Sequence, residues 1–357
     1  MIKQSRQPLF LLTGGGTAGS VTPLLAIAEA LRKNRPELQL SWLGTVSGPE
    51  KILVEEAGID FRAISSGKFR RYWSIANFID LFRIIKGFGQ AVSFIYQTRP
   101  KLVISAGSFV SVPVVWAAKF FRVPVVIEQL DYRPGLANKL MSVVANEVLV
   151  TFEKSCQDYG RKAIWLGAPI RERFYQVDQA IQTPWKFLEE KPVVLVFGGG
   201  TGAAGINQLI DEQLIEITRV ANVIHLTGKG KGRAENNGNY YQTDFLEQKL
   251  MFAAYHEADL VIARAGLGTL IELAAFKKAS LIIPMPNSHQ IENAQVIKEA
   301  GAALVFAEKE LANGQLNKQI EKVIDNKTGQ AVMTANWPRA IKIADSVAIN
   351  QVFEKYF

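Results

Sequence analysis

The 357-residue sequence predicts an α/β fold built from two similar domains with a cleft between them. Apolar segments of strand length alternate with segments of helix length throughout, which is typical of parallel sheets with crossover helices. A glycine-rich loop follows an apolar run in each half of the chain. The length also exceeds what one hydrophobic core usually serves, so two domains are expected.

The two glycine-rich loops are the most informative segments. The first, Thr13–Ser20, follows the apolar run Pro8–Leu12, and the second, Gly198–Ala203, follows Val193–Phe197. Glycine permits a tight turn, and the N-terminus of a following helix favours an anion. Neither loop continues as the Gly-Lys-Ser/Thr of a Walker A motif, and neither is a clear G-x-G-x-x-G with an acidic residue at the right distance. A dinucleotide site is therefore only weakly indicated.

Each half is expected to form an open sheet whose ligands lie beyond the carboxyl ends of the strands. Strands are predicted at 8–12, 38–43, 101–105, 123–127 and 146–150 in the first half, and at 192–197, 222–226, 259–263, 279–284 and 302–306 in the second. Helices are predicted at 22–33, 48–57, 75–97, 134–143, 203–218, 267–276 and 290–300.

The domain boundary is expected where Gly167-Ala168-Pro169 interrupts the pattern. The prediction is a first domain over 1–165, a second over 166–336, and a final helix over 337–357 that packs back on the first domain. Polar and small residues over Arg233–Thr243 predict a mobile surface loop.

The formal charge of +8 favours anionic partners. No nucleic-acid-binding motif is present, whereas Lys68–Trp73 is rich in basic and aromatic residues and leads into a segment with Phe82, Ile85 and Phe88 interleaved with Arg83 and Lys86. Basic residues beside aromatics suit an anionic membrane surface. A helix packed on its own domain, with a solvated basic side, is the alternative.

Other classes are disfavoured by composition. The one cysteine, Cys156, excludes an internal disulfide, and the first apolar run is too short for a secretory signal. The longest weakly charged stretch, Val103–Ala118, falls short of the roughly 20 apolar residues that span a bilayer.

A group of candidate binding residues lies in the second half. Arg264–Glu272 follows the apolar run Asp259–Ala263, so its glycines open a helix from which Glu272 projects. A carboxylate there can accept both hydroxyls of a ribose. A solvated glutamate near a helix start, favoured by the helix dipole, is the alternative. The second glycine turn and the later segment Pro284–Ala294, which contains His289 and Gln290, favour binding.

With these motifs, the chain resembles the bacterial MurG transferase family over almost its whole length. Further matching segments, in the family's order, are Val21–Pro23, Ser105–Pro113, Pro134–Lys139, Gly167–Arg171 and Thr227–Gly230. That family transfers N-acetylglucosamine (GlcNAc) from UDP-GlcNAc to the N-acetylmuramic acid (MurNAc) of the undecaprenyl-pyrophosphoryl acceptor lipid I, giving lipid II of peptidoglycan. The resemblance implies two Rossmann-like domains facing a cleft, the GT-B glycosyltransferase architecture. It also implies an inverting transfer, no cofactor, and a peripheral location on the cytoplasmic face of the cell membrane.

The resemblance also implies roles for individual residues. Glu272 would hold the ribose, the backbone near Leu246 the uracil, and His289 with Gln290 the sugar. Arg171 and the loop Gly200, Thr201 and Gly202 would face the pyrophosphate. The remaining donor residues would be Thr17, Gly19, Gly266 and Thr269, and the acceptor residues Gly15, Gly16, Gly107, Ser108 and Asn138. No Asp-x-Asp motif is present, so no obligatory metal is expected.

The chain departs from the family at the expected base. The family's first loop ends in a histidine where this chain has Ser20, its His-Glu-Gln-Asn segment reads Glu128–Asp131, and Gly200 replaces a serine. Serine is a poor base near neutral pH. Asp131 is the first hypothesis for the base and Glu128 the second, with a helix N-cap as the alternative role of Asp131.

Three other functions are compatible with these departures to different degrees. The chain could be a catalytically weak homologue that binds UDP-sugar or lipid as a scaffold, or a transferase for another glycolipid acceptor. A nicotinamide-dependent dehydrogenase is disfavoured, because no acidic ribose partner follows the first loop.

Overall fold

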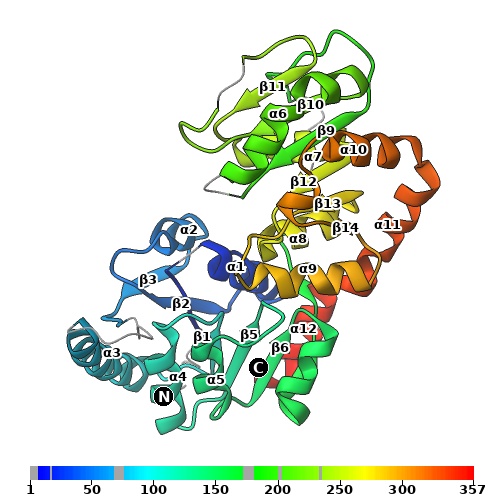
Figure 1. Cartoon of the computed structure of the whole chain (residues 1–357). Coiled ribbons are helices and arrows are strands. Elements are labelled where there is room, and N and C mark those ends of the chain that lie inside the picture. Colours follow the sequence, from blue (N-terminus) through cyan, green and yellow to red (C-terminus); the bar gives the residue numbers. More distant parts are fainter. Residues whose placement is uncertain (1–6, 17, 68–75, 172–180, 200–202, 233–234) are drawn as a thin grey trace. The chain divides into compact units, whose positions relative to one another are not determined.

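The computed structural model describes residues 7–16, 18–67, 76–171, 181–199, 203–232 and 235–357 (Figure 1). The chain divides into two compact units, Met1–Glu172 together with Ile343–Phe357, and Arg173–Lys342. In the part of the chain that is described, no helix has the length and apolar character needed to cross a membrane.

A parallel sheet forms the centre of the first unit. Within the described residues it has seven strands in the order β3-β2-β1-β4-β5-β6-β7. The order reverses between β1 and β4, which is where open α/β sheets bind ligands at the carboxyl ends of their strands. The strands are β1 (Leu9–Thr13), β2 (Gln39–Gly44), β3 (Asp60–Ala63), β4 (Leu102–Ser105), β5 (Val125–Gln129), β6 (Glu147–Val150) and β7 (Ala163–Trp165).

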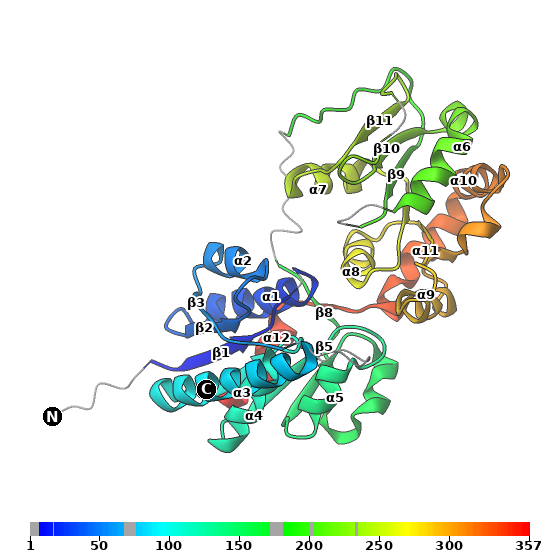
Figure 2. The same ribbon diagram turned by 60° about the vertical axis from the view of Figure 1, so that its left-hand side comes forward.

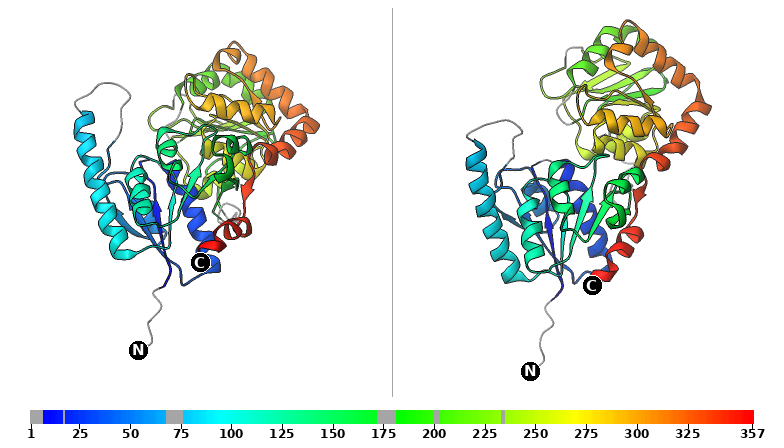
Figure 3. Two further views of the ribbon diagram at one scale, coloured as in Figure 1. Left: turned by 90° about the horizontal axis from the view of Figure 1, so that it is seen from below. Right: turned by 60° about the horizontal axis from the view of Figure 1, so that its bottom comes forward.

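Helices cover both faces of this sheet (Figures 2 and 3). One face carries α1 (Ala18–Asn34), α2 (Glu50–Glu56) and α12 (Ser346–Phe353); the other carries α3 (Ala76–Thr98), α4 (Ser111–Phe120) and α5 (Leu136–Ser142). Short 3₁₀ turns occur at Glu153–Asp158, Gly160–Lys162 and Glu354–Tyr356.

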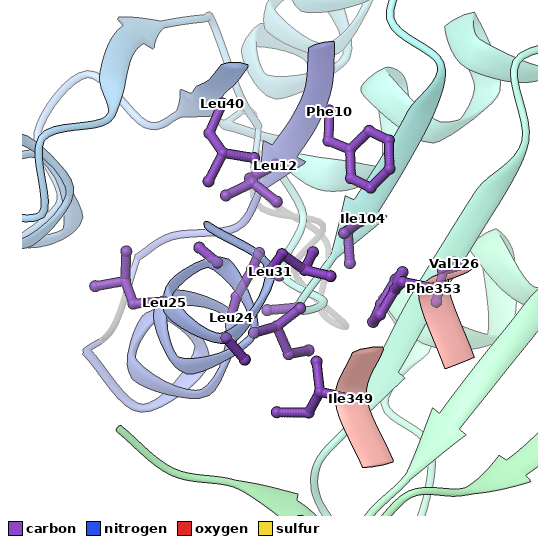
Figure 4. Close-up of a cluster of buried hydrophobic side chains, with 14 of the residues drawn as sticks. Phe10, Leu12, Leu24, Leu25, Leu31, Leu40, Ile104, Val126, Ile349 and Phe353 are labelled. Atoms are coloured by element: carbon purple, nitrogen blue, oxygen red, sulfur yellow. The ribbon is translucent and has the colours of Figure 1, made fainter. Parts of the chain in front are cut away.

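The core beneath α1 joins distant parts of the chain (Figure 4). Successive side chains of a strand point to opposite faces of the sheet, so alternate residues of β1 enter this core. Its members include Phe10, Leu12, Leu24, Leu31, Ile104, Val126, Ile349 and Phe353, all essentially closed to solvent. The last helix therefore completes the core of the first unit.

The second unit repeats the architecture. Its parallel sheet, counted over the described residues, has the strand order β11-β10-β9-β12-β13-β14. The strands are β9 (Val193–Phe197), β10 (Asn222–Leu226), β11 (Tyr240–Thr243), β12 (Leu260–Ala263), β13 (Ser280–Ile282) and β14 (Leu304–Val305). The helices are α6 (Ala204–Val220), α7 (Gln248–Glu257), α8 (Leu267–Phe276), α9 (Gln290–Glu299), α10 (Gln315–Asp325) and α11 (Lys327–Ala340), with a 3₁₀ turn at Glu308–Glu310.

The expected mobile loop Arg233–Thr243 is wrong at its end. Tyr240–Thr243 forms β11, which pairs with β10, and Tyr240 is fully buried. Aromatic residues and threonine favour strands, but a strand of only four residues after a polar stretch gives too weak a signal to predict. The sequence also does not predict β3, which has four residues, or β7, which has three.

A final helix packs on the first unit as expected, but its predicted bounds are wrong. Helix α11 ends at Ala340, soon after Pro338, and Ile343–Ala344 forms the short strand β15, which pairs with β8 (Ala168–Pro169). A new helix, α12, then begins where the Asp345 carboxylate accepts the Ala348 N–H at 2.8 Å. The first unit thus runs to Glu172 rather than 165, since β8 pairs within it, and resumes at Ile343 rather than 337.

Candidate functional site

Glu272 is held on α8, in the middle of that helix, in the second unit. The glutamate is half-buried, and its Oε2 accepts a hydrogen bond from the Tyr255 hydroxyl at 2.8 Å. Tyr255 is fully buried and stacks on Phe276 with ring centroids 4.8 Å apart. Burial raises the pKa of the Glu272 carboxyl to about 7, while the hydrogen bond from Tyr255 acts in the opposite direction. Glu272 is therefore not a solvated helix-start glutamate.

The His289–Gln290 segment meets the beginning of the same helix. Gly266 is the N-cap of α8, and a Cβ placed on it would lie 3.9 Å from Gln290 Nε2. Gln290 Oε1 accepts the Met285 N–H at 3.0 Å, which fixes this amide. His289 is exposed at the N-cap of α9, and Thr269 lies half-buried in the first turn of α8. Gln290 thus lies at the N-terminus of the helix that carries Thr269 and Glu272.

The second glycine turn lies at the carboxyl edge of the same sheet, directly after β9. A Cβ on Gly198 would lie 2.4 Å from the Ala203 nitrogen, so only glycine fits there. Gly199 has φ of +89°, in the region that favours glycine. Gly200, Thr201 and Gly202 lie outside the described residues. Leu246 is buried in the segment between β11 and α7.

The first glycine loop is supported by a residue that the sequence does not single out. Glu50 is fully buried and accepts the Gly16 N–H at 3.1 Å and the Thr45 N–H at 2.7 Å. A Cβ on Gly15 would lie 2.2 Å from Glu50 Oε1, which explains the glycine there. The only signal for Glu50 in the sequence is its place in Gly48-Pro49-Glu50, at the start of a helix.

The predicted acceptor residues gather at the carboxyl edge of the first sheet. Gly107 and Ser108 both have positive φ, +85° and +75°, in the turn before α4. A Cβ on Gly107 would lie 3.0 Å from Asn138 Oδ1, and one on Gly16 would lie 3.9 Å from Ser108 Oγ. Residues from three separate segments are therefore neighbours.

The two carboxylates proposed as bases have different environments. Glu128, on β5, is only 2% exposed, and neither of its oxygens has a hydrogen-bond partner among the described residues. Burial raises the pKa of the Glu128 carboxyl to about 8. Asp131 is half-buried just beyond the strand. Helix α5 is capped by Gly135, so the alternative role of Asp131 as its N-cap is wrong.

The remaining predicted residues lie in or near the first unit. Arg171 is largely buried, and its Nε lies 3.2 Å from Glu29 Oε2 on α1. Gly19 and Ser20 are in the first turn of α1, whereas Thr17 lies outside the described residues. In the ranges that the structure describes, no group of three or more histidine, cysteine or acidic side chains could hold a metal ion.

Comparison with known proteins identifies the family. Residues 10–150 match the glycosyltransferase family 28 N-terminal domain, and residues 193–348 match its C-terminal domain. A Clostridium kluyveri protein, the UDP-N-acetylglucosamine–N-acetylmuramyl-(pentapeptide) pyrophosphoryl-undecaprenol N-acetylglucosamine transferase, is 37% identical over 355 residues, 97% of this chain and 99% of that protein. The Clostridium botulinum (strain Langeland) protein of the same name is 37% identical over 325 residues, 89% and 91% of the two chains. The chain belongs to this transferase family.

Solved structures agree with the fold. The crystal structure of Acinetobacter baumannii MurG has a TM-score of 0.74 and 24% identity, covering 98% of this chain and 99% of the other. The predicted two-domain α/β fold with parallel sheets is confirmed, as is the resemblance to the family. The chain is a glycosyltransferase, so the prediction of a transferase is confirmed over the dehydrogenase.

Proposed function

We propose that this enzyme transfers GlcNAc from UDP-GlcNAc to the MurNAc of lipid I, forming lipid II in peptidoglycan synthesis. Relatives named as N-acetylglucosamine transferases of this lipid acceptor match 89% and 97% of the chain at 37% identity. The observation in the structure that carries the proposal is Glu272 on α8, oriented by the Tyr255 hydroxyl, on the same helix whose N-cap, Gly266, lies next to Gln290.

The donor is proposed to bind the second unit. The Glu272 carboxylate accepts the ribose hydroxyls, the backbone near Leu246 meets the uracil, and His289 and Gln290 meet the sugar. The glycine turn after β9 is proposed to meet the diphosphate. UDP leaves with negative charge on its diphosphate, and the N-terminus of the helix that follows the turn stabilises that charge as it develops.

The acceptor is proposed to bind at the carboxyl edge of the first sheet, near Gly16, Ser108 and Asn138. Its hydroxyl attacks the anomeric carbon as the bond to UDP breaks, with inversion, and its proton passes to a base. Asp131 is the stronger candidate for that base, because Glu128 is closed to solvent and Ser20 is a poor base.

Replacing Asp131 with asparagine tests this role. General-base catalysis typically contributes about 10²–10⁴-fold, so the D131N turnover number should fall by that factor while UDP affinity stays the same. Single-turnover kinetics with saturating donor measures the first quantity and calorimetry the second. Unchanged turnover would remove Asp131 from the mechanism.

The membrane is proposed as the surface on which the enzyme works, at the cytoplasmic leaflet. Phe82 and Ile85 on α3 are 72% and 60% exposed, beside exposed Arg83 and Lys86. Further along the same helix, Phe94 and Ile95 pack into the core. One half of α3 is thus anchored while the other presents an apolar and basic face suited to anionic lipid. The expected basic segment Lys68–Trp73 lies outside the described residues.

The function is tested by mixing the protein with UDP-GlcNAc and a lipid I analogue and measuring UDP release and disaccharide product. Product formation is the expected result. A non-catalytic scaffold is a second candidate, favoured by Ser20 in place of the family's histidine. Donor binding without any turnover would support the scaffold, and no binding of donor or lipid would reject both.

A further inference from the structure

Hydrogen bonds join four buried residues in series across the second unit, from β11 to the turn after β10. The Tyr240 hydroxyl lies 2.9 Å from His225 Nδ1, and His225 Nε2 lies 3.1 Å from Asn207 Oδ1. Asn207 Nδ2 donates to the Thr227 carbonyl at 2.9 Å. All four residues are buried, so water does not complete their hydrogen bonding from outside.

The direction of these hydrogen bonds follows from the last acceptor, the Thr227 carbonyl. A backbone carbonyl can only accept, so the Asn207 nitrogen must face Thr227 and its oxygen must face the imidazole. His225 Nε2 therefore carries the proton, and the lone pair on Nδ1 accepts from the Tyr240 hydroxyl. Burial lowers the pKa of His225 to about 4, so the ring is neutral at pH 7 and a single tautomer satisfies both neighbours.

These hydrogen bonds connect three segments of the second unit, where the donor nucleotide is proposed to bind. Asn207 lies in the first turn of α6, immediately after the second glycine turn. Thr227 opens the Thr227–Gly230 turn, and its N–H donates to the Thr243 carbonyl at 3.0 Å. Gly228 N–H donates to the Asp244 carbonyl at 3.1 Å, and Gly230 N–H to the Asp244 carboxylate at 3.1 Å. These bonds extend the connection to within two residues of Leu246.

We propose that Asn207 and His225 are positioning residues for the donor nucleotide. They join the helix start that faces the diphosphate to the segment that faces the uracil, and so set the span between the two ends of the UDP moiety. Neither side chain reaches the ligand, because both are buried behind the turns that they connect. This inference rests on the proposed function for the identity of the ligand.

The same helix supplies a matched control. Gln213, also on α6, is buried, donates to the Leu311 carbonyl at 3.0 Å and accepts the Asn317 N–H at 3.1 Å. Like Asn207, Gln213 is a buried amide with two hydrogen bonds. Its partners lie on α10 and just before it, rather than in the two turns. N207L and Q213L each replace a buried amide with an apolar side chain of comparable size.

Calorimetry with UDP, at a temperature well below unfolding, separates positioning from a general structural role. N207L should raise the Kd for UDP about tenfold, the effect of one lost buried hydrogen bond, while Q213L should leave it unchanged. In the full reaction N207L should raise the KM for UDP-GlcNAc and keep kcat, since the lost interaction is formed in both ground and transition states. Equal Kd values for wild type and N207L, or an equal rise in Q213L, would overturn the inference. A wild-type protein that does not bind UDP would instead overturn the proposed function.

Nitrogen-15 NMR of the wild-type protein gives a test that needs no variant to fold. The His225 imidazole should be neutral and protonated on Nε2 from pH 6 to 8, and UDP should shift its signals although the ring does not touch the nucleotide. A ring protonated on Nδ1, or one whose signals do not respond to saturating UDP, contradicts the proposal.

Discussion

Single residues in this enzyme owe their chemistry to neighbours that are distant in the chain. Glu272 is an ordinary helix residue in the sequence, but the buried Tyr255 hydroxyl holds one of its oxygens and burial raises its pKa to about 7. Burial raises the pKa of Glu128 further, to about 8, and neither of its oxygens has a hydrogen-bond partner in the described part of the chain. Both groups therefore change charge near physiological pH.

The affinity for UDP should depend on pH through Glu272. The carboxylate accepts the ribose hydroxyls as the anion, so the Kd for UDP should fall as pH rises through about 7 and then level off. The glutamine of E272Q does not ionise, so this variant should bind UDP more weakly, with a Kd that does not change with pH over the same range. Calorimetry between pH 5.5 and 8.5 measures both curves. Parallel curves for the two proteins would exclude Glu272 as the titrating group.

Glu128 should lower stability at alkaline pH. Its folded pKa, about 8, lies above the unfolded value near 4.5, so the folded state binds the extra proton and loses stability as pH rises from about 4.5 to 8. The isosteric E128Q variant has no charge to bury. It should be more stable than wild type by roughly 2–4 kcal/mol at pH 8.5, with a smaller difference at pH 5. Urea unfolding at the two pH values measures this, and a difference that does not vary with pH contradicts it.

At the scale of elements, short strands and helix ends were harder to predict than long helices. Helices such as α6 and α8 were predicted within two residues of their ends, because an apolar face and a preceding glycine turn are local signals. Strand β11 was taken for a loop, since its four residues follow a polar stretch and its partner β10 lies elsewhere in the sequence. Pairing, rather than propensity, makes it a strand.

The exposed half of α3 gives a prediction about membrane binding. I85S removes an apolar side chain that is 60% exposed, so sedimentation with anionic vesicles should weaken several-fold, and added salt should weaken it further. The control I215S removes an isoleucine that is 69% exposed on α6, and its binding should match wild type. Equal losses in the two variants, or equal binding to neutral vesicles, would argue against this face as the membrane contact.

At the scale of the whole molecule, the chain leaves the first unit, builds the second and returns. The return depends on β15 pairing with β8 and on α12, whose Ile349 and Phe353 enter the core beneath α1 (Figure 4). The last helix thus belongs energetically to the unit that contains the first strand.

Truncating Phe353 should affect only that unit. Phe353 is fully buried, so F353A should cost about 3–5 kcal/mol. Hydrogen exchange should accelerate in β1, α1 and β4 and remain unchanged in β9–β14. V347A, which alters a residue 64% exposed on the same helix, serves as the control and should cost less than about 0.5 kcal/mol. Acceleration spread equally over both units would contradict this assignment of α12.

The sequence by itself determined the two α/β halves, the two glycine turns and the transferase family. These features are encoded locally, in apolar periodicity, in glycine positions and in motifs read along the chain. Only the tertiary structure decided that Glu50 supports the first loop, that Tyr255 orients Glu272, that Glu128 is buried without a partner, and that α12 closes the first core. Each of these depends on which distant residues the packing of helices against sheets brings within contact, and no local pattern carries that information.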